Sequence, residues 1–446
     1  MATDKSETSA MAGGHPATAR PKIRRWTYLR TLGPGLVTGA ADDDPSGIAT
    51  YSQAGAQFGF ALLWTVPLTL PFMIAIQLVS ARIGRVTGLG IVANIRRHYP
   101  VPVVALLVGL LVGANVINIA ADIAAMGEAL RLVAGGSAHA YAIMFACVGM
   151  LLQVFIPYRR YAPFLKWLTL SLLAYVATAL SVQIPWVDAL KATIFPAFSA
   201  APAYLLVIVG VFGTTISPYL FFWQAAEEIE VMNAGRGHKP LRELKHGGNL
   251  EIRRIGRDTI IGMSFSNIVA FFIILTTAAT LNLHGITNIQ TSAQAAEALR
   301  PLAGQATFLL FSLGIIGTGL LAVPVLAGSA AYGVAEAFGW PASLEAKPRD
   351  ALSFYLIIIV ATLVGLGLGF TPIDPIAMLF WSAVLNGIVS VPIMFMLMIM
   401  GANRKIMGRF TIHTSLLVLG WAATALMALA VAALAAVTLL SVFAAR

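Results

Sequence analysis

The chain has 446 residues, of which 58% are hydrophobic and only 11% are charged, against roughly 25% charged residues in an ordinary soluble protein. A water-soluble globule needs far more surface charge, so the composition excludes a soluble enzyme, a disordered protein and a coiled coil. The long apolar segments indicate an α-helical multi-pass membrane protein, because a helix satisfies its own backbone polar groups inside a bilayer.

Eleven segments are apolar over about 20 residues, the length that crosses a bilayer. These predicted spans are 31–57, 60–81, 101–131, 138–157, 163–184, 201–228, 259–283, 306–336, 352–371, 373–400 and 411–443. Residues 1–30 are polar and basic and lack the apolar core of a signal peptide, so we expect a disordered cytoplasmic tail.

The net charge of +10 comes from 29 Lys and Arg against 19 Asp and Glu. With eleven alternating spans, 25 of these 29 basic residues fall on the same side as the N-terminus and 4 on the other side. Basic loops stay cytoplasmic, which predicts a cytoplasmic N-terminus and an outer C-terminus in a cell membrane, with the bacterial inner membrane favoured. The charge therefore signals orientation, and we expect no nucleic-acid partner.

Three consecutive aspartates at 42–44 lie inside the first apolar segment. On insertion scales one central Asp costs roughly 2.5–3.5 kcal/mol, so these acids need a protein-lined or water-filled cavity and a cation or hydrogen bonds. Pro45 removes an amide donor, and with Ser46 and Gly47 it predicts an unwound helix over 44–47 with free carbonyls for a hard cation. The alternative is a Pro-kinked helix with its acids at one aqueous end.

The sixth segment carries a matching weak point, the run GTTISP from Gly213 to Pro218. Interrupted helices in corresponding positions point to inverted repeats with a binding site at the midplane between the breaks. We therefore predict an all-α fold with a first five-helix repeat over 31–184, a second over 201–400 and an additional helix over 411–443.

Two further acids lie in the third segment. Asp122 belongs either to a proton or ion path or to a structural hydrogen bond, and Glu128 stands three residues before Arg131, which favours a simple ion pair. Asn386 in the tenth segment is explained by interhelical hydrogen bonding or by contact with the site. None of the 7 histidines pairs at metal-ligand spacing, and no phosphate-binding loop or nucleophile elbow is present, so we expect no cofactor and no enzyme activity.

Several motifs carry a family resemblance. The run GPG, eight residues and then Asp44-Pro45, followed by IATYSQAGAQFGFALLW, resembles the first-helix signature of the Nramp divalent-metal transporters. ANRKIMGRF at 402–410 is similar to that family's NRKLMG segment, and Asp122, GLLAVPVLAGSAAYGVAEAFGW and TTISP also have counterparts there. The resemblance covers about 31–440 and implies a leucine-transporter-type fold and proton-linked uptake of manganese, iron or related divalent ions.

The chain departs from the family pattern at the site itself. The usual Asp-Pro-Gly-Asn is here Asp44-Pro45-Ser46-Gly47, and the usual Met-Pro-His-Asn is the stretch 217–220, Ser-Pro-Tyr-Leu. The thioether ligand is thus replaced by a hydroxyl, which weakens selectivity for soft transition metals. Tyr219 and Gln224 replace histidines tied to proton handling, and Ala125 replaces an acid. The pattern resembles the Nramp-related magnesium transporters.

We therefore predict a secondary transporter that moves Mn²⁺, Mg²⁺ or both by alternating access, as a monomer in the lipid bilayer, with proton coupling in question. The predicted metal ligands are Asp44, Asp43, Thr214, Thr215, Ser217 and Gly47. The predicted proton or ion pathway comprises Asp122, Glu128, Tyr219, Gln224 and Asn386. Two alternatives stay open at this point: an amine or amino-acid transporter on the same fold, or a membrane protein that binds metal without transporting it.

Overall fold

The computed structural model describes residues 34–157, 160, 170–234, 239–244 and 247–444, so the tail predicted over residues 1–30 lies outside it. Within these ranges every regular element is helical. The α-helices are α1 (Pro34–Asp42), α2 (Pro45–Phe58), α3 (Thr65–Thr87), α4 (Ile91–His98), α5 (Val101–Ala134), α6 (Ala138–Phe155), α8 (Leu173–Ser181), α9 (Trp186–Ile194), α10 (Pro202–Thr215), α11 (Pro218–Ala234), α12 (Asn249–Thr280), α13 (Ser292–Ala296), α14 (Arg300–Ala303), α15 (Thr307–Phe338), α16 (Leu352–Leu368), α17 (Pro375–Ala402), α18 (Arg404–Met407) and α19 (Thr414–Ala444). Short 3₁₀ turns are η2 (Gly59–Leu62), η3 (Leu170–Leu172), η4 (Leu241–Glu243), η5 (Asn282–His284), η6 (Glu297–Leu299), η7 (Gly304–Ala306) and η8 (Gly408–Phe410).

Membrane-spanning capacity is set by helix length and apolar composition. The described residues contain 8 spans that pass both criteria, or up to 9 if Leu170–Ser181 and Trp186–Ile194, which are bent by 118°, count as one. The apolar helix α16 is shorter, and the broken pair α1–α2 coincides with the predicted first span. The all-helical membrane architecture is confirmed, while the number of eleven spans stays a prediction.

The first predicted interruption lies between α1 and α2, where Asp43 and Asp44 are the non-helical residues. Pro45 occupies the first position of α2, where its missing N–H leaves no hydrogen bond unmade and its fixed φ suits the helix. The expected unwinding over 44–47 is therefore wrong at three of its four residues, because Pro45, Ser46 and Gly47 form the first turn of α2.

The second predicted interruption is confirmed. Helix α10 ends at Thr215 and α11 begins at Pro218, so Ile216 and Ser217 connect two helices of one apolar segment. The reason is the same, since a proline can start a helix but cannot continue one without losing a backbone hydrogen bond.

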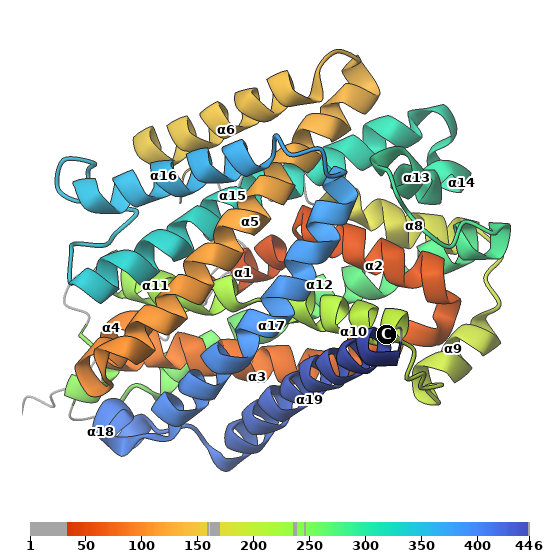
Figure 1. Cartoon of the computed structure of the whole chain (residues 1–446). Coiled ribbons are helices and arrows are strands. Elements are labelled where there is room, and N and C mark those ends of the chain that lie inside the picture. Colours follow the sequence, from red (N-terminus) through yellow and green to blue (C-terminus); the bar gives the residue numbers. More distant parts are fainter. Residues whose placement is uncertain (1–33, 158–159, 161–169, 235–238, 245–246, 445–446) are drawn as a thin grey trace, which may run out of the picture. The chain divides into compact units, whose positions relative to one another are not determined.

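Small residues let the broken helices pack closely on their neighbours. A side chain at Gly39 of α1 would overlap the carbonyl group of Gly262 in α12, and one at Gly213 of α10 would overlap the backbone of α17 at Ala383 and Gly387. Figure 1 shows the long helix α5 with α15, α16 and α17 packed around it. These contacts hold both breaks in the interior, between helices distant in sequence.

Candidate functional site

Asp44 is the N-cap of α2 and is 1% exposed. Its Oδ1 accepts hydrogen bonds from the Gly47 amide at 2.8 Å and from the Ser46 hydroxyl at 2.6 Å. An N-cap carboxylate satisfies amides at a helix start and benefits from the helix dipole. The break therefore fixes the Asp44 side chain in one orientation through its own turn.

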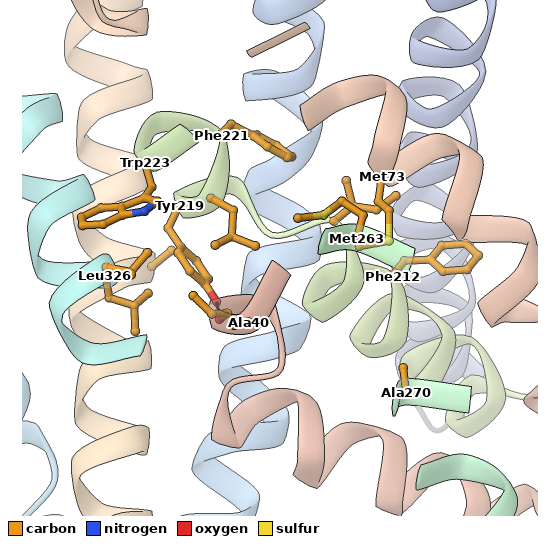
Figure 2. Packing of buried hydrophobic residues seen from close by; sticks show 14 of the residues in the cluster. Ala40, Met73, Phe212, Tyr219, Phe221, Trp223, Met263, Ala270 and Leu326 are labelled. Atoms are coloured by element: carbon orange, nitrogen blue, oxygen red, sulfur yellow. Dashed lines mark hydrogen bonds between the residues drawn. The ribbon is translucent and has the colours of Figure 1, made fainter. Parts of the chain in front are cut away.

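The second carboxylate oxygen of Asp44 faces other helices. Its Oδ2 accepts one hydrogen bond from Asn118 Nδ2 of α5 and one from the Tyr219 hydroxyl of α11, each at 3.1 Å. Figure 2 shows Tyr219 directed from α11 toward α1, with its hydroxyl beside Ala40; the same hydroxyl lies 3.3 Å from the Ala41 carbonyl oxygen. Asp44 thus joins α2 to both α5 and α11.

Hydroxyl groups line the break between α10 and α11. Ser217 Oγ donates to the carbonyl oxygens of Gly213 and Thr214, at 3.0 and 2.7 Å. Thr215 Oγ1 donates to Val211 O at 2.6 Å and lies 3.1 Å from the Tyr51 hydroxyl of α2. The Ser217 bonds satisfy carbonyls at the end of α10, which the interrupted helix would otherwise leave without donors.

The first turn of α2 adjoins the end of α10 at Gly47. A Cβ atom at this position would lie 3.2 Å from Thr214 Oγ1, so glycine leaves the Thr214 hydroxyl in contact with the first turn of α2. Thr214 is 1% exposed, and its hydroxyl has no hydrogen-bond partner among the described residues. The structure thus brings together Asp44, Gly47, Thr214 and Tyr219, as the sequence interpretation expects of a site between two breaks.

The neighbouring acids Asp42 and Asp43 face α12 instead. The single hydroxyl of Ser266 lies 2.5 Å from Asp42 Oδ2 and 3.0 Å from Asp43 Oδ1. The opposite oxygens, Asp42 Oδ1 and Asp43 Oδ2, are buried without a partner in the described part of the chain. Asp43 is therefore next to Asp44 in the chain while its side chain is hydrogen-bonded to another helix.

Over most of its length the chain is similar in sequence to known transporters. Residues 35–437 match the family Nramp, natural resistance-associated macrophage protein-like. The chain belongs to the Nramp family. It is 29% identical over 428 residues to the divalent metal cation transporter MntH of Klebsiella pneumoniae, covering 93% of this chain and 96% of that protein. The family membership predicted from the first-helix and 402–410 motifs is confirmed.

Solved structures agree on the fold. The Eremococcus coleocola manganese transporter in complex with an aromatic bis-isothiourea compound aligns with a TM-score of 0.73 at 15% identity, over 92% of this chain and 87% of that one. The inward-facing conformation of Mhp1 aligns with a TM-score of 0.51 at 13% identity, over 91% of each chain. This Nramp chain thus has the predicted leucine-transporter-type fold.

The residues predicted for a proton or ion pathway lie in different settings in this Nramp chain. Asp122 is fully buried, and neither carboxylate oxygen has a partner among the described residues. Gln224 accepts a hydrogen bond from Thr38 of α1 at 2.5 Å. Asn386 is buried on α17 with both amide atoms unpaired within the described ranges. Glu128 lies 2.5 Å from Arg131 at its exposed end, which agrees with the ion-pair interpretation.

Sequence reasoning missed Asn118, although it contacts Asp44 directly. The signal was present, because Asn118 is a polar residue in an apolar run and stands four residues before Asp122. Residues at this spacing share one helix face, so the face that carries Asp122 also carries Asn118. Tyr51 and Ser266 were missed as well, because hydroxyl-bearing side chains are common in helices and carry no distinct pattern.

The atoms that could ligate a cation determine which kind of ion the site suits. Among the described residues no three His, Cys, Asp or Glu side chains cluster to hold a metal ion. An ion at Asp44 would therefore draw its other ligands from hydroxyl, amide and backbone oxygens and from water. Oxygen ligands of this kind suit hard cations such as magnesium.

A separate cavity of about 340 Å³ lies between α4, α11 and α15. Glu230, Tyr332 and Glu336 are among its lining residues. Tyr332 donates a hydrogen bond to Glu230 at 2.9 Å, and its ring lies 6.5 Å from the buried ring of Trp223. Trp223 and Tyr219 stand one helical turn apart on α11 and so share one helix face (Figure 2). Tyr219 on this face contacts Asp44, and Trp223 lies nearer the cavity.

Proposed function

We propose that this Nramp chain carries a divalent metal cation across its membrane by alternating access, with Asp44 as the anchoring carboxylate. The observation that supports it best is a buried aspartate at the junction of two interrupted helices, in contact with a third. Buried ionisable groups in membrane helices mark ion pathways by default. The relatives named above are a divalent metal cation transporter and a manganese transporter.

The ligand set favours a hard ion among the divalent cations. We infer that Asp44, carbonyls at the two breaks and the hydroxyls of Thr214, Thr215 and Ser217 surround a partly hydrated Mg²⁺ or Mn²⁺, with Asp43 adding charge. Magnesium keeps several waters and takes only one or two carboxylates. Ser217 brings no thioether, so the discrimination that a soft ligand provides against magnesium is lost.

Proton coupling is proposed to be weak or absent. Tyr219 donates its hydroxyl to Asp44, and Gln224 accepts a bond from Thr38, so neither position offers a histidine to take up a proton. Asp122 is the remaining acid of the predicted pathway in this region, and Ala125 stands where a second acid would pair with it. Transport of Mg²⁺ should then depend little on a pH gradient.

The test is ion flux in proteoliposomes, with Mg²⁺ or Mn²⁺ outside, with and without a pH gradient. The variant Asp44→Asn keeps an N-cap acceptor for Gly47 but removes the charge, so we expect flux to fall to that of protein-free liposomes. The matched control is Asp374→Asn, because Asp374 also precedes a proline and caps its helix through the Ile376 amide at 2.9 Å. Equal flux in wild type and Asp44→Asn would refute the assignment.

We also propose that the chain is a monomer in the cell membrane and that its N-terminus is cytoplasmic. In this proposal residues 31–184 and 201–400 form two five-helix repeats, and residues 411–443 form an added helix. In a Cys147→Ala background, a membrane-impermeant maleimide on intact cells should label Gln290→Cys but not Arg349→Cys. Both positions are exposed. The reverse labelling would invert the topology, and light scattering in detergent would report the mass of the particle.

A further inference from the structure

The two oxygens of the Asp44 carboxylate are held by different parts of the chain. Oδ1 is bonded at 2.6 and 2.8 Å within its own turn, by Ser46 and Gly47. Oδ2 is bonded at 3.1 Å by Asn118 and Tyr219, which belong to other helices. The longer bonds to separate helices are the ones that can open, so Oδ2 is the oxygen that an arriving cation can reach.

Asn118 has an unused acceptor at this place. The residue is fully buried, and its Nδ2 donates to Asp44, while its Oδ1 has no hydrogen-bond partner among the described residues. A buried polar atom without a partner is unfavourable and calls for a ligand that this conformation does not supply. An amide oxygen is also a good ligand for a hard cation.

The amide group can exchange its two ends without moving the helix. A half-turn about the side-chain Cβ–Cγ bond places Oδ1 where Nδ2 lies now, about 3.1 Å from Asp44 Oδ2. The first turn of α2 offers no amide side chain there, because position 47 is glycine. Asp122 follows one helical turn later, on the same face of α5 as Asn118.

We propose that Asn118 is a two-state ligand of the transported cation. It donates through Nδ2 to Asp44 Oδ2 in the conformation seen here, and it turns Oδ1 onto the metal ion when the ion binds Asp44. Asn118 thereby completes an oxygen ligand set and also offsets the Asp44 charge when the ion leaves. This inference rests on the proposed divalent-cation transport.

A matched control exists one turn earlier on the same helix. Asn115 is also fully buried, and its Oδ1 also lacks a partner within the described chain, but its Nδ2 donates to the Leu326 carbonyl at 2.9 Å. Asn115→Leu therefore reproduces the loss of a buried amide from α5 without touching Asp44. Any difference between Asn118→Leu and Asn115→Leu reports on the site.

The experiment is isothermal titration of the full-length protein in detergent with MgCl₂ and, separately, MnCl₂, after each variant has been checked for a cooperative melting transition. We expect Asn118→Leu to weaken binding about tenfold or more, the order seen when groups that support a metal site are lost, and Asn115→Leu to bind like wild type. Binding by Asn118→Leu that equals or exceeds that of Asn115→Leu would overturn the proposal, because a donor that only positions Asp44 contributes no ligand.

A second variant, in which the side chains at positions 44 and 118 are exchanged, tests the proposal if Asn118→Leu fails to fold. The double variant Asp44→Asn/Asn118→Asp retains one carboxylate and one amide at the same contact. If position 118 reaches the ion, the double variant binds Mg²⁺ more tightly than Asp44→Asn alone; equal or weaker binding contradicts the proposal. Failure of wild type to bind either ion would instead refute the proposed function, so the two failures are distinguishable.

Discussion

Tyr219→Phe removes one hydrogen bond to the proposed ligand oxygen and nothing else of similar size. The Tyr219 hydroxyl lies 3.1 Å from Asp44 Oδ2 and 3.3 Å from Ala41 O, and its one proton can serve only one of them fully. If a cation must displace this donor to reach Oδ2, the hydroxyl competes with the ion. Its removal should then tighten binding of Mg²⁺ and Mn²⁺.

The size of the effect follows from the bond. A hydrogen bond to a charged group contributes about 1.5–3 kcal/mol net, and the 3.1 Å distance, long for an O–H···O contact, places this one at the lower end. About 1.4 kcal/mol corresponds to a factor of ten in Kd. We therefore expect Tyr219→Phe to bind the ions about tenfold more tightly than wild type.

The assay is calorimetric titration in detergent, with Tyr332→Phe as the matched control. Tyr332 is also buried, and its hydroxyl also donates to a carboxylate, that of Glu230 at 2.9 Å, but this pair lines the separate cavity, so its loss should leave Kd near the wild-type value. Weaker binding by Tyr219→Phe would show that the phenol oxygen is itself a ligand. An unchanged Kd would show that Tyr219 does not compete for Oδ2. Either result refutes the reasoning.

Two further predictions concern selectivity and packing. Ser217→Met should raise the preference for Mn²⁺ or Cd²⁺ over Mg²⁺ in competition titrations, because a thioether favours softer metals; an unchanged order would remove Ser217 from the ligand set. Gly39→Ala should lower the Tm, because its methyl group would overlap the Gly262 carbonyl. Overpacking of this kind costs about 1–3 kcal/mol of folding free energy. The control is Gly113→Ala, whose methyl group meets nothing within 4 Å and should leave the Tm unchanged. Similar melting of both glycine variants would contradict the close packing of α1 on α12.

The sequence predicts the two helix breaks better than it predicts the side chains that contact them. Both interruptions could be located from the chain, because each combines a proline with acidic, hydroxyl or glycine residues in an apolar segment. Proline alone is not sufficient, since Pro71, Pro324 and Pro392 lie inside continuous helices. The first interruption was nevertheless predicted over 44–47, whereas the non-helical residues are Asp43 and Asp44: Pro45 begins α2, and Ser46 and Gly47 are helical. Whether a proline starts a helix or lies within one depends on which backbone groups find partners in the folded chain.

The hydrogen bonds of the hydroxyl side chains in the second break could not be predicted from the sequence. Ser217 and Thr215 were predicted as metal ligands from their place in the second break. Both hydroxyls donate to carbonyls of α10, and the Thr215 oxygen also lies 3.1 Å from the Tyr51 hydroxyl. The sequence shows that a side chain carries a hydroxyl, but the fold decides where its single proton goes.

The sequence by itself determined the membrane class and the places of the two breaks, and it singled out Asp44 as a candidate ligand. Each of these rests on physics that acts within one short segment: apolar length, the missing amide of proline and the high free energy of an acid in a bilayer. The family followed from the resemblance of its motifs. Only the tertiary structure decided which groups surround that acid. Asn118 is 74 residues and Tyr219 is 175 residues away along the chain, and a hydrogen bond across such separations exists only once α2, α5 and α11 have packed together.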